Sequence, residues 1–218
     1  MNITREKMNY DLLIVGAGPS GLSAAINFKK LCKLNNKEFS VCVVEKGSEV
    51  GAHILSGAIL EPTALNELVE NWKEIEDCPV KTPVKKESLR YLSKSKSYNF
   101  PSFLIPTAMH NKGNYIISLG AFCKWLAGEA ERLGVEIYPG FTASEILMID
   151  DSLSGIITGD LGVKKDGQPG ENFQPGIEIH SKFTLFAEGC RGHLGKKIMK
   201  SFDLRKDSQH QTYGIGLK

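Results

Sequence analysis

A glycine-rich pattern, Gly16-Ala-Gly18-Pro-Ser-Gly21, constrains the fold of this chain more than any other segment. Before it, residues 10–15 form a short apolar run that ends in glycine, as a buried parallel strand does. After it, residues 20–34 have helical periodicity, and residues 39–45 form a second apolar run that ends in Glu45. Strand, glycine turn, helix and strand make one βαβ unit, which is the context in which this pattern binds a dinucleotide.

Each glycine of the pattern has its own expected role. Gly16 permits the tight turn, Gly18 lets the backbone approach a pyrophosphate, and Gly21 lets helix and strand pack closely. The N-terminus of the helix then faces the anion. Glu45 follows Gly16 by about thirty residues, where its carboxylate accepts hydrogen bonds from the adenosine ribose and disfavours a 2′-phosphate. The alternative is a glycine-rich turn that only packs a helix on a sheet.

The rest of the chain is expected to complete one α/β fold around this unit. We predict an FAD/NAD(P)-binding Rossmann-like fold of the glutathione-reductase type, with a β-meander and an inserted α+β layer. Residues 1–50 hold the first βαβ unit, residues 51–117 the insertion, and residues 118–218 the remainder with the meander. In the remainder we predict a helix, a third strand, three meander strands and a fourth parallel strand, at residues 118–134, 135–138, 144–149, 153–159, 176–180 and 183–187.

The insertion contains two segments rich in apolar residues. Residues 61–72 are predicted as an amphipathic helix with Leu65, Leu68 and Trp72 on its apolar face. Residues 100–106 form a second apolar run, Phe-Pro-Ser-Phe-Leu-Ile-Pro. The helix is expected either to pack on the protein's own core or to lie at a membrane interface.

Composition excludes several classes of function. Lys and Arg number 27 and Asp and Glu 25, and this net charge of +2 argues against a nucleic-acid partner. The 5 cysteines include no Cys-x-x-Cys pair, so neither a disulfide framework nor a metal site is predicted. No spacing suggests a Ser–His–Asp arrangement, and we predict no catalytic residue. The polar N-terminus does not resemble a signal peptide, which favours a reducing compartment.

The order of the elements favours FAD over NAD as the dinucleotide. FAD-binding folds commonly begin with this βαβ unit, resume after a long insertion with a helix and a strand, and pass through a β-meander into a fourth parallel strand. The predicted fourth strand runs into Phe186-Ala-Glu-Gly-Cys-Arg-Gly192. This segment is similar to the second glycine-and-acid motif of FAD-dependent hydroxylases and reductases, with Glu188 where Asp is more usual.

Motifs along the whole chain resemble one family, the electron transfer flavoprotein-ubiquinone oxidoreductases. They are Val15-Gly-Ala-Gly-Pro-Ser-Gly-Leu-Ser-Ala-Ala25, Val44-Glu-Lys46, Gly51-Ala-His-Ile-Leu-Ser-Gly57, Asn114-Tyr-Ile116, Gly134-Val-Glu-Ile-Tyr-Pro-Gly140, Phe186-Ala-Glu-Gly-Cys190 and Gln211-Thr-Tyr-Gly-Ile-Gly-Leu217. The resemblance implies a set of FAD contacts. The pyrophosphate contacts are Gly16, Gly18, Pro19, Ser20 and Gly21, and the contacts at the adenosine end are Glu45 and Lys46. Gly51, Ser56 and Gly57 line the flavin side, and the backbone near Ala143 meets the adenine. Gly189, in the second glycine motif, is the last of the implied contacts.

The resemblance also implies an activity and partners. The flavin takes electrons singly from electron transfer flavoprotein and passes them to ubiquinone, and full-length members hold a 4Fe–4S cluster in a region beyond residue 218. The residues here resemble the N-terminal part, without the quinone and cluster regions, and we expect no quinone reduction by this chain alone. Residues 61–72 and 100–106 are expected to attach to one leaflet, on the cytoplasmic face of a bacterial inner membrane or the matrix face of the mitochondrial one.

Two other interpretations stay open from the sequence. The first is an FAD reductase related to geranylgeranyl reductases, whose N-terminal fingerprints are similar. The second is a truncated, non-catalytic fragment that binds nucleotide poorly. Residues 51–57 and 213–217 favour the oxidoreductase over the first of these, and a flavin absorbance spectrum separates both enzymes from the second.

Overall fold

The computed structural model describes residues 4–55, 57–190, 192–210 and 212. Its centre is a 6-stranded sheet in the order β8-β2-β1-β13-β10-β9. The first four of these strands run parallel, β10 runs antiparallel to β13, and β9 runs antiparallel to β10. In the order of the sheet, the strands span Glu136–Pro139, Val41–Glu45, Lys7–Val15, Glu178–Phe186, Ser152–Thr158 and Ala143–Ile149. This sheet, β-meander included, confirms the predicted fold class.

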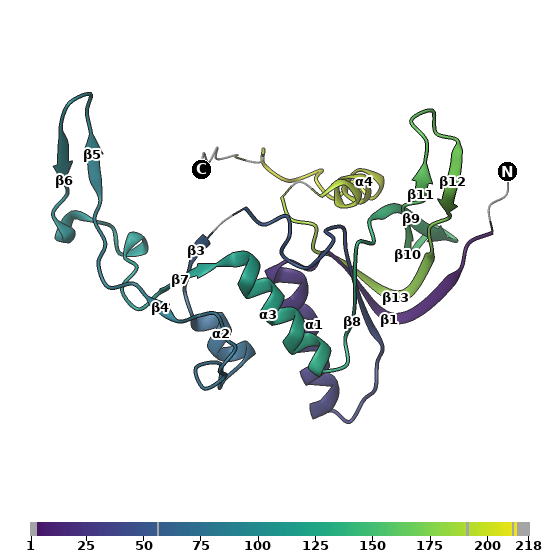
Figure 1. The fold of residues 1–218 in the computed structure, drawn as a ribbon, viewed down its shortest axis with the longest axis horizontal. Coiled ribbons are helices and arrows are strands. Elements are labelled where there is room, and N and C mark those ends of the chain that lie inside the picture. The colour runs from purple at the N-terminus through teal and green to yellow at the C-terminus, as the bar shows by residue number, and fades with distance from the viewer. Residues whose placement is uncertain (1–3, 56, 191, 211, 213–218) are drawn as a thin grey trace.

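Two helices cover one face of the sheet, as Figure 1 shows. They are α1 (Pro19–Leu34) and α3 (Leu119–Arg132), which lie side by side. Proline at the first helical position suits α1, and the Ser118 hydroxyl caps α3 by accepting from the Ala121 amide at 3.4 Å. The shared core of this face contains Ile14 and Val43 from the strands.

The opposite face of the sheet has its own core. Leu13 and Val44 are the sequence neighbours of Ile14 and Val43, so they point to this opposite face, where they pack with Ile156 and Ile179. Leu194, from α4 (His193–Ser201), completes this cluster. The strands β1 and β2 are therefore buried on both sides, which explains their nearly continuous apolar sequence.

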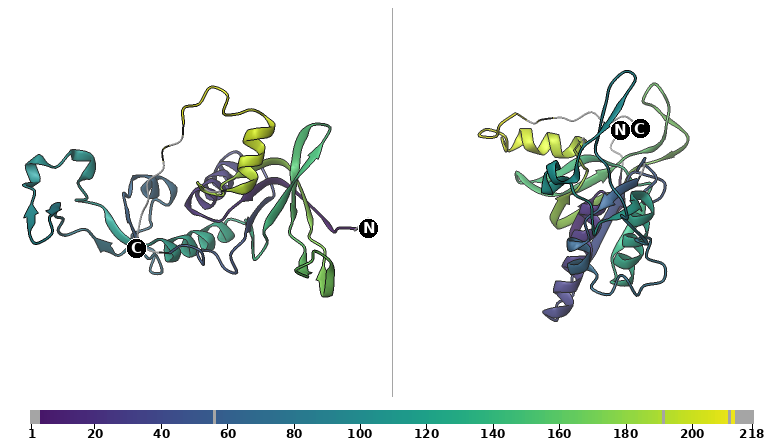
Figure 2. Two further views of the ribbon diagram at one scale, coloured as in Figure 1. Left: turned by 90° about the horizontal axis from the view of Figure 1, so that it is seen from above. Right: turned by 90° about the vertical axis from the view of Figure 1, so that its left-hand side faces the viewer.

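The insertion forms a separate layer that extends away from the sheet (Figures 1 and 2). Its sheet has the order β3-β7-β4, formed by Gly57–Leu60, Tyr115–Ser118 and Thr82–Pro83, and α2 (Thr63–Leu68) packs nearby. Residues 85–111, which we call the arm, reach farthest from the main sheet. The arm contains the hairpin β5–β6 (Arg90–Leu92 and Ser97–Asn99) and two short 3-10 helices, η1 (Ser102–Leu104) and η2 (Thr107–Met109).

The predicted helix over residues 61–72 is wrong in its length, and the core-packing alternative accounts for its apolar face. The helix α2 ends at Leu68, whose carbonyl accepts a hydrogen bond from Lys30, and Val69 leaves the helical region with φ −139° and ψ 84°. Leu65 and Trp72 are buried, with Trp72 only 2% exposed. The Trp72 indole donates to Asn66 at 2.8 Å and meets Tyr115 edge-on. The apolar face is therefore part of the protein's own core.

The predicted strands at 176–180 and 183–187 are a single strand, β13, which pairs with β1 and, at its start, with β10. Polar residues in the middle of β13 have partners in β13 itself or in the neighbouring strand β1. His180 lies 3.0 Å from Glu178, the Ser181 and Thr184 hydroxyls are 2.8 Å apart, and Lys182 forms an ion pair with Asp11. The turn-rich segment before β13 also contains a hairpin, β11 (Leu161–Val163) with β12 (Pro169–Gln174).

Candidate dinucleotide-binding site

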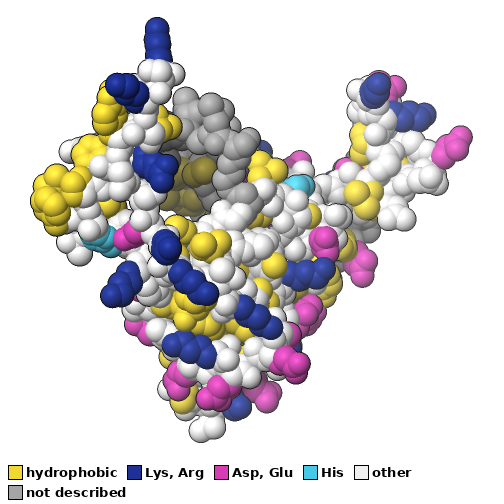
Figure 3. Space-filling model, turned by 60° about the vertical axis from the view of Figure 1, so that its left-hand side comes forward, with side chains coloured by type: hydrophobic (Ala, Val, Ile, Leu, Met, Phe, Trp, Pro, Cys, Tyr) yellow, Lys and Arg dark blue, Asp and Glu magenta, His cyan; other side chains and the backbone are white. Residues whose placement is uncertain are grey.

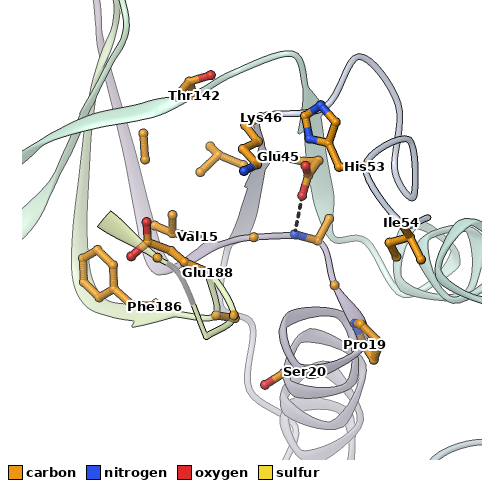
Figure 4. Close-up of a pocket in the computed structure, with 18 of the residues that line it drawn as sticks. Val15, Pro19, Ser20, Glu45, Lys46, His53, Ile54, Thr142, Phe186 and Glu188 are labelled. Carbon is orange, nitrogen blue, oxygen red and sulfur yellow. Dashed lines mark hydrogen bonds between the residues drawn. The ribbon is translucent and has the colours of Figure 1, made fainter. Parts of the chain in front are cut away.

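A cavity of about 650 Å³ lies at the carboxyl ends of β1, β2 and β13. This is the edge of an open parallel sheet at which ligands bind in α/β folds. The glycine turn after β1 crosses it, as Figure 4 shows, with Glu45 and Lys46 on one side and Glu188 on the other. Ile54 and Phe186 add apolar surface. The cavity is therefore formed by chain segments that are distant in the sequence.

The three glycines of the turn differ in what surrounds them. Gly16 has φ +107°, and a Cβ there would lie 2.5 Å from the Ala187 carbonyl oxygen. A Cβ on Gly21 would lie 2.0 Å from the Gly16 carbonyl oxygen. A Cβ on Gly18 meets no atom of the described residues within 4 Å, although Gly18 lines the cavity. Gly16 and Gly21 are thus required by packing, and Gly18 leaves room for a ligand.

The N-terminus of α1 opens onto this cavity. Gly18 is its N-cap, and among the described residues no side chain caps the helix and no acidic residue stands in its first turn. The first amides of a helix have no partner within the helix and carry a partial positive charge. A helix end of this kind binds phosphate groups readily.

Glu45 is fixed by backbone amides on two sides. One carboxylate oxygen accepts from the Ala17 amide at 3.0 Å, shown as the dashed line in Figure 4, and the other accepts from the Gly47 amide at 2.8 Å. A carboxylate has about four acceptor positions, so both oxygens retain capacity for a ligand hydroxyl.

The Glu45 charge also affects the thiol of Cys123 in α3. Burial, and to a smaller extent this charge, raise the pKa of the Cys123 thiol to about 11. The thiol is thus neutral at physiological pH.

Glu188 reaches from the end of β13 to the first turn of α4. Its carboxylate accepts from the Gly195 amide at 2.6 Å and from the Leu194 amide at 3.3 Å. Gly192 gives room for this, since a Cβ there would lie 2.4 Å from the Glu188 Cβ. An aspartate would be one methylene shorter, so the contact with α4 accounts for glutamate at this position.

The structure brings most of the predicted site residues to one place. The cavity is lined by Gly16, Gly18, Pro19, Ser20, Glu45, Lys46, Gly51, Ala143 and Gly189. Gly21 lies beneath the turn, and Gly57 is in β3, where it pairs with Ser118; neither is among the lining residues. Ser56 and residues 213–217 lie outside the described part of the chain. The FAD contacts inferred for these residues stay predictions.

Sequence reasoning missed part of the lining. It overlooked Phe141 and Thr142, which follow β8, and His193, which begins α4. The available signal was positional, because Phe141 and Thr142 follow a strand whose carboxyl end reaches the same edge of the sheet. His53, in the segment after Gly51, does line the cavity and projects beside Glu45 in Figure 4.

Among the described residues, no three His, Cys, Asp and Glu side chains gather where they could hold a metal ion. None of the helices within the described ranges is long and apolar enough to cross a membrane.

A sequence family and solved structures both support the fold. The family described as "NAD(P)-binding Rossmann-like domain" matches residues 14–71. A geranylgeranyl bacteriochlorophyll reductase-like protein from Thermoplasma acidophilum superposes with a TM-score of 0.57 at 20% identity, covering 83% of this chain and 39% of that one. The FAD-dependent halogenase CndH gives 0.56 at 17% identity, covering 85% and 38%. At these identities the likeness concerns the fold alone.

Comparison of sequences gives much higher similarity. The "probable electron transfer flavoprotein-ubiquinone oxidoreductase" of Acinetobacter baylyi is 56% identical over 100% of this chain and 39% of its own length. The Pseudomonas aeruginosa enzyme is 55% identical over 98% and 39%, and the human mitochondrial enzyme 48% over 100% and 35%. This chain thus spans less than two fifths of the length of these relatives. The resemblance predicted from the motifs is confirmed, and over its whole length this chain is a homologue of the electron transfer flavoprotein-ubiquinone oxidoreductases.

Proposed function

We propose that this chain provides the FAD-binding part of an enzyme that carries electrons from reduced electron transfer flavoprotein to ubiquinone. The observation that carries the proposal is the open space at Gly18, beside the uncapped end of α1, in a chain 48–56% identical to relatives of that name. The geranylgeranyl reductase alternative is supported only by likeness of fold.

The residues around the cavity suit FAD. Amides at the start of α1 hold the pyrophosphate, and the fixed carboxylate of Glu45 accepts from the ribose. Ile54 and Phe186 offer apolar surface to the bound cofactor. When bound, FAD supplies the redox chemistry, because its ring accepts and releases electrons. The protein binds, orients and shields it.

Flavin binding is the first test. Purified chain is titrated with FAD and followed by calorimetry and by the flavin absorbance spectrum. Gly18→Ala should weaken binding at least about tenfold, because the new methyl group projects into the cavity, and should leave thermal stability unchanged. Gly128→Ala is the matched control, because a Cβ there also meets no described atom but lies away from the cavity. Absence of FAD binding by the unaltered chain would contradict the proposal.

Electron transfer is the second test. Reduced electron transfer flavoprotein is mixed with the FAD-loaded chain, and bleaching of the bound flavin is followed by stopped flow. We expect bleaching faster than for free FAD at equal concentration. Equal rates would contradict the assignment of this donor. Turnover with quinone is measured in parallel, and we predict none for the 218-residue chain by itself.

We further propose that the arm attaches the protein to a membrane surface. Phe103 is 83% exposed and Leu92 72% exposed, and Tyr91 and Leu104 are also exposed. Figure 3 shows Lys and Arg side chains beside exposed hydrophobic ones. The sequence of the arm contains five cationic residues: Lys85, Lys86, Arg90, Lys94 and Lys96. Exposed aromatic and apolar groups with adjacent cations suit an interface with anionic lipid. This moves the proposed attachment away from residues 61–72 and retains residues 100–106.

Vesicle flotation tests this attachment. The chain is mixed with vesicles that contain anionic lipid, and Phe103→Asp is expected to reduce the floating fraction severalfold. Leu34→Asp is the matched control, because Leu34 is an exposed apolar residue at the end of α1, outside the arm. Equal flotation of both variants would contradict the role of the arm. The membrane face, bacterial cytoplasmic or mitochondrial matrix, stays a prediction.

A further inference from the structure

An aromatic side chain in the cavity wall is anchored to the sheet behind it. Phe141 lines the cavity and meets Tyr138 edge-on, with 5.7 Å between ring centres and 70° between ring planes. The Tyr138 hydroxyl donates to the Glu136 carboxylate at 2.6 Å, and the Tyr10 hydroxyl donates to the same oxygen at 2.7 Å. These four side chains connect β1 and β8 to the cavity.

The order of the strands shows which part of the cavity Phe141 faces. Along the carboxyl edge, β1 ends in the glycine turn, its neighbour β2 ends at Glu45, and β8 lies beyond β2. The segment after β8 begins with Gly140, whose amide donates to the Gly47 carbonyl at 2.7 Å, and continues into Phe141. A ligand with phosphate at the glycine turn and ribose at Glu45 therefore extends toward Phe141 with its next group.

We infer that Phe141 is the aromatic surface for the nucleobase end of the dinucleotide, and that Tyr138 and Glu136 are positioning residues that hold its ring. The inference rests on the proposed function, because it requires a dinucleotide in the cavity. The ligand class recognised here is an adenine nucleotide, a group that both FAD and ADP contain. Stacking on a fixed ring recognises the π-face of a base.

The hydrogen bonds explain how the ring is held. Both phenol groups lower the pKa of Glu136, so its carboxylate is ionised and accepts both bonds at neutral pH. Charge-assisted bonds of this kind are stronger than neutral ones. With its hydroxyl fixed at one end, Tyr138 presents a constant surface to the edge of Phe141. The ring is thus positioned before a ligand arrives, which lowers the entropy lost on binding.

The test measures ADP and FAD affinity by calorimetry for a set of variants. Phe141→Leu keeps apolar bulk and loses the ring, and we expect both affinities to fall about tenfold, by the same factor. Tyr138→Phe removes the anchoring hydroxyl, and we expect a fall of about threefold for both ligands. Phe141→Tyr retains the ring and should bind like the unaltered chain. Tyr98→Phe, on the exposed hairpin, is the control and should change neither affinity.

Four outcomes would overturn the inference. A loss confined to FAD, with ADP unaffected, would place Phe141 at the flavin half. Unchanged binding of both ligands by folded Phe141→Leu, checked by circular dichroism, would remove its role and leave the proposed function intact. If Phe141→Leu does not fold, the affinities of Tyr138→Phe and Phe141→Tyr decide between the two explanations. An equal threefold loss of affinity in both variants would show general disruption of the site instead of positioning of the ring. Failure of the unaltered chain to bind either ligand would overturn both proposals.

Discussion

Gly21 lies in the first turns of α1, where replacement by alanine has two effects of opposite sign. In a helix interior, alanine is favoured over glycine by about 1 kcal/mol, because the unfolded chain loses freedom and the helix gains a better former. The new Cβ would, however, lie 2.0 Å from the Gly16 carbonyl oxygen, 3.1 Å from Cγ2 of Ile14 and 3.3 Å from the Ala187 Cβ. These atoms belong to the turn, to β1 and to the residue that follows β13.

The steric effect decides the sign. A backbone oxygen at 2.0 Å cannot move aside as a flexible side chain does, so the first turn of α1 has to shift from the sheet. Overpacking in a well-packed core costs about 1–3 kcal/mol, and displacement of backbone lies at the upper end of that range. After the helix gain of about 1 kcal/mol, Gly21→Ala should lower the free energy of unfolding by about 2 kcal/mol.

The assay is urea unfolding followed by circular dichroism, with a second glycine as the matched control. Gly128 is also inside a helix, α3, but its Cβ would meet no described atom within 4 Å. Gly128→Ala should therefore raise the free energy of unfolding by up to about 1 kcal/mol. If both variants were stabilised equally, the steric reasoning about the glycine turn would be refuted.

Three further predictions concern residues outside the turn. Trp72→Ala should lower the free energy of unfolding by about 3–5 kcal/mol in urea titrations, because a buried indole and its hydrogen bond are lost; an unchanged midpoint would contradict its place in the core. Glu188→Asp should accelerate amide hydrogen exchange in α4 about tenfold, because the shorter carboxylate no longer reaches the helix amides; unaltered protection would contradict the cap. Asp11 has its pKa lowered to about 2 by Lys182 and Ser40. Its contribution to stability is therefore complete above about pH 4 and lost as pH falls toward 2. The melting temperature of Asp11→Asn should therefore depend less on pH over that interval than that of the unaltered chain. Parallel curves of melting temperature against pH for the two proteins would contradict this role of Asp11.

The glycine turn could be predicted from sequence because its determinants are local. An apolar strand, glycines at fixed spacing and a helix that starts with Pro19 specify one βαβ geometry, whatever the rest of the chain does. The position of Glu45 follows from the same unit, because it ends the second strand. The carboxyl edge of the sheet then brings these parts together without further information.

The apolar face around Trp72 could not be assigned in the same way. Helical periodicity shows that one face avoids water, and it does not distinguish a protein core from a lipid interface. The deciding facts were the Asn66 partner of the indole and the contact with Tyr115, which lies 43 residues later in the chain. The exposed apolar residues of the hairpin, such as Leu92, form too short a run to show periodicity.

The two acidic residues beside the cavity show why residue type alone gives an incomplete account of a site. Glu45 is expected from sequence to accept from a ribose, yet its carboxylate already accepts from the Ala17 and Gly47 amides. Glu188 likewise holds α4 through the Gly195 amide. Each carboxylate is thereby immobile before a ligand binds, so binding loses little side-chain entropy, a saving on the order of 1 kcal/mol per residue. Glycines two residues after Glu45 and four after Glu188 make these contacts sterically feasible. At this edge of the sheet, Glu45 and Glu188 are therefore fixed carboxylates that both shape a turn and face the cavity.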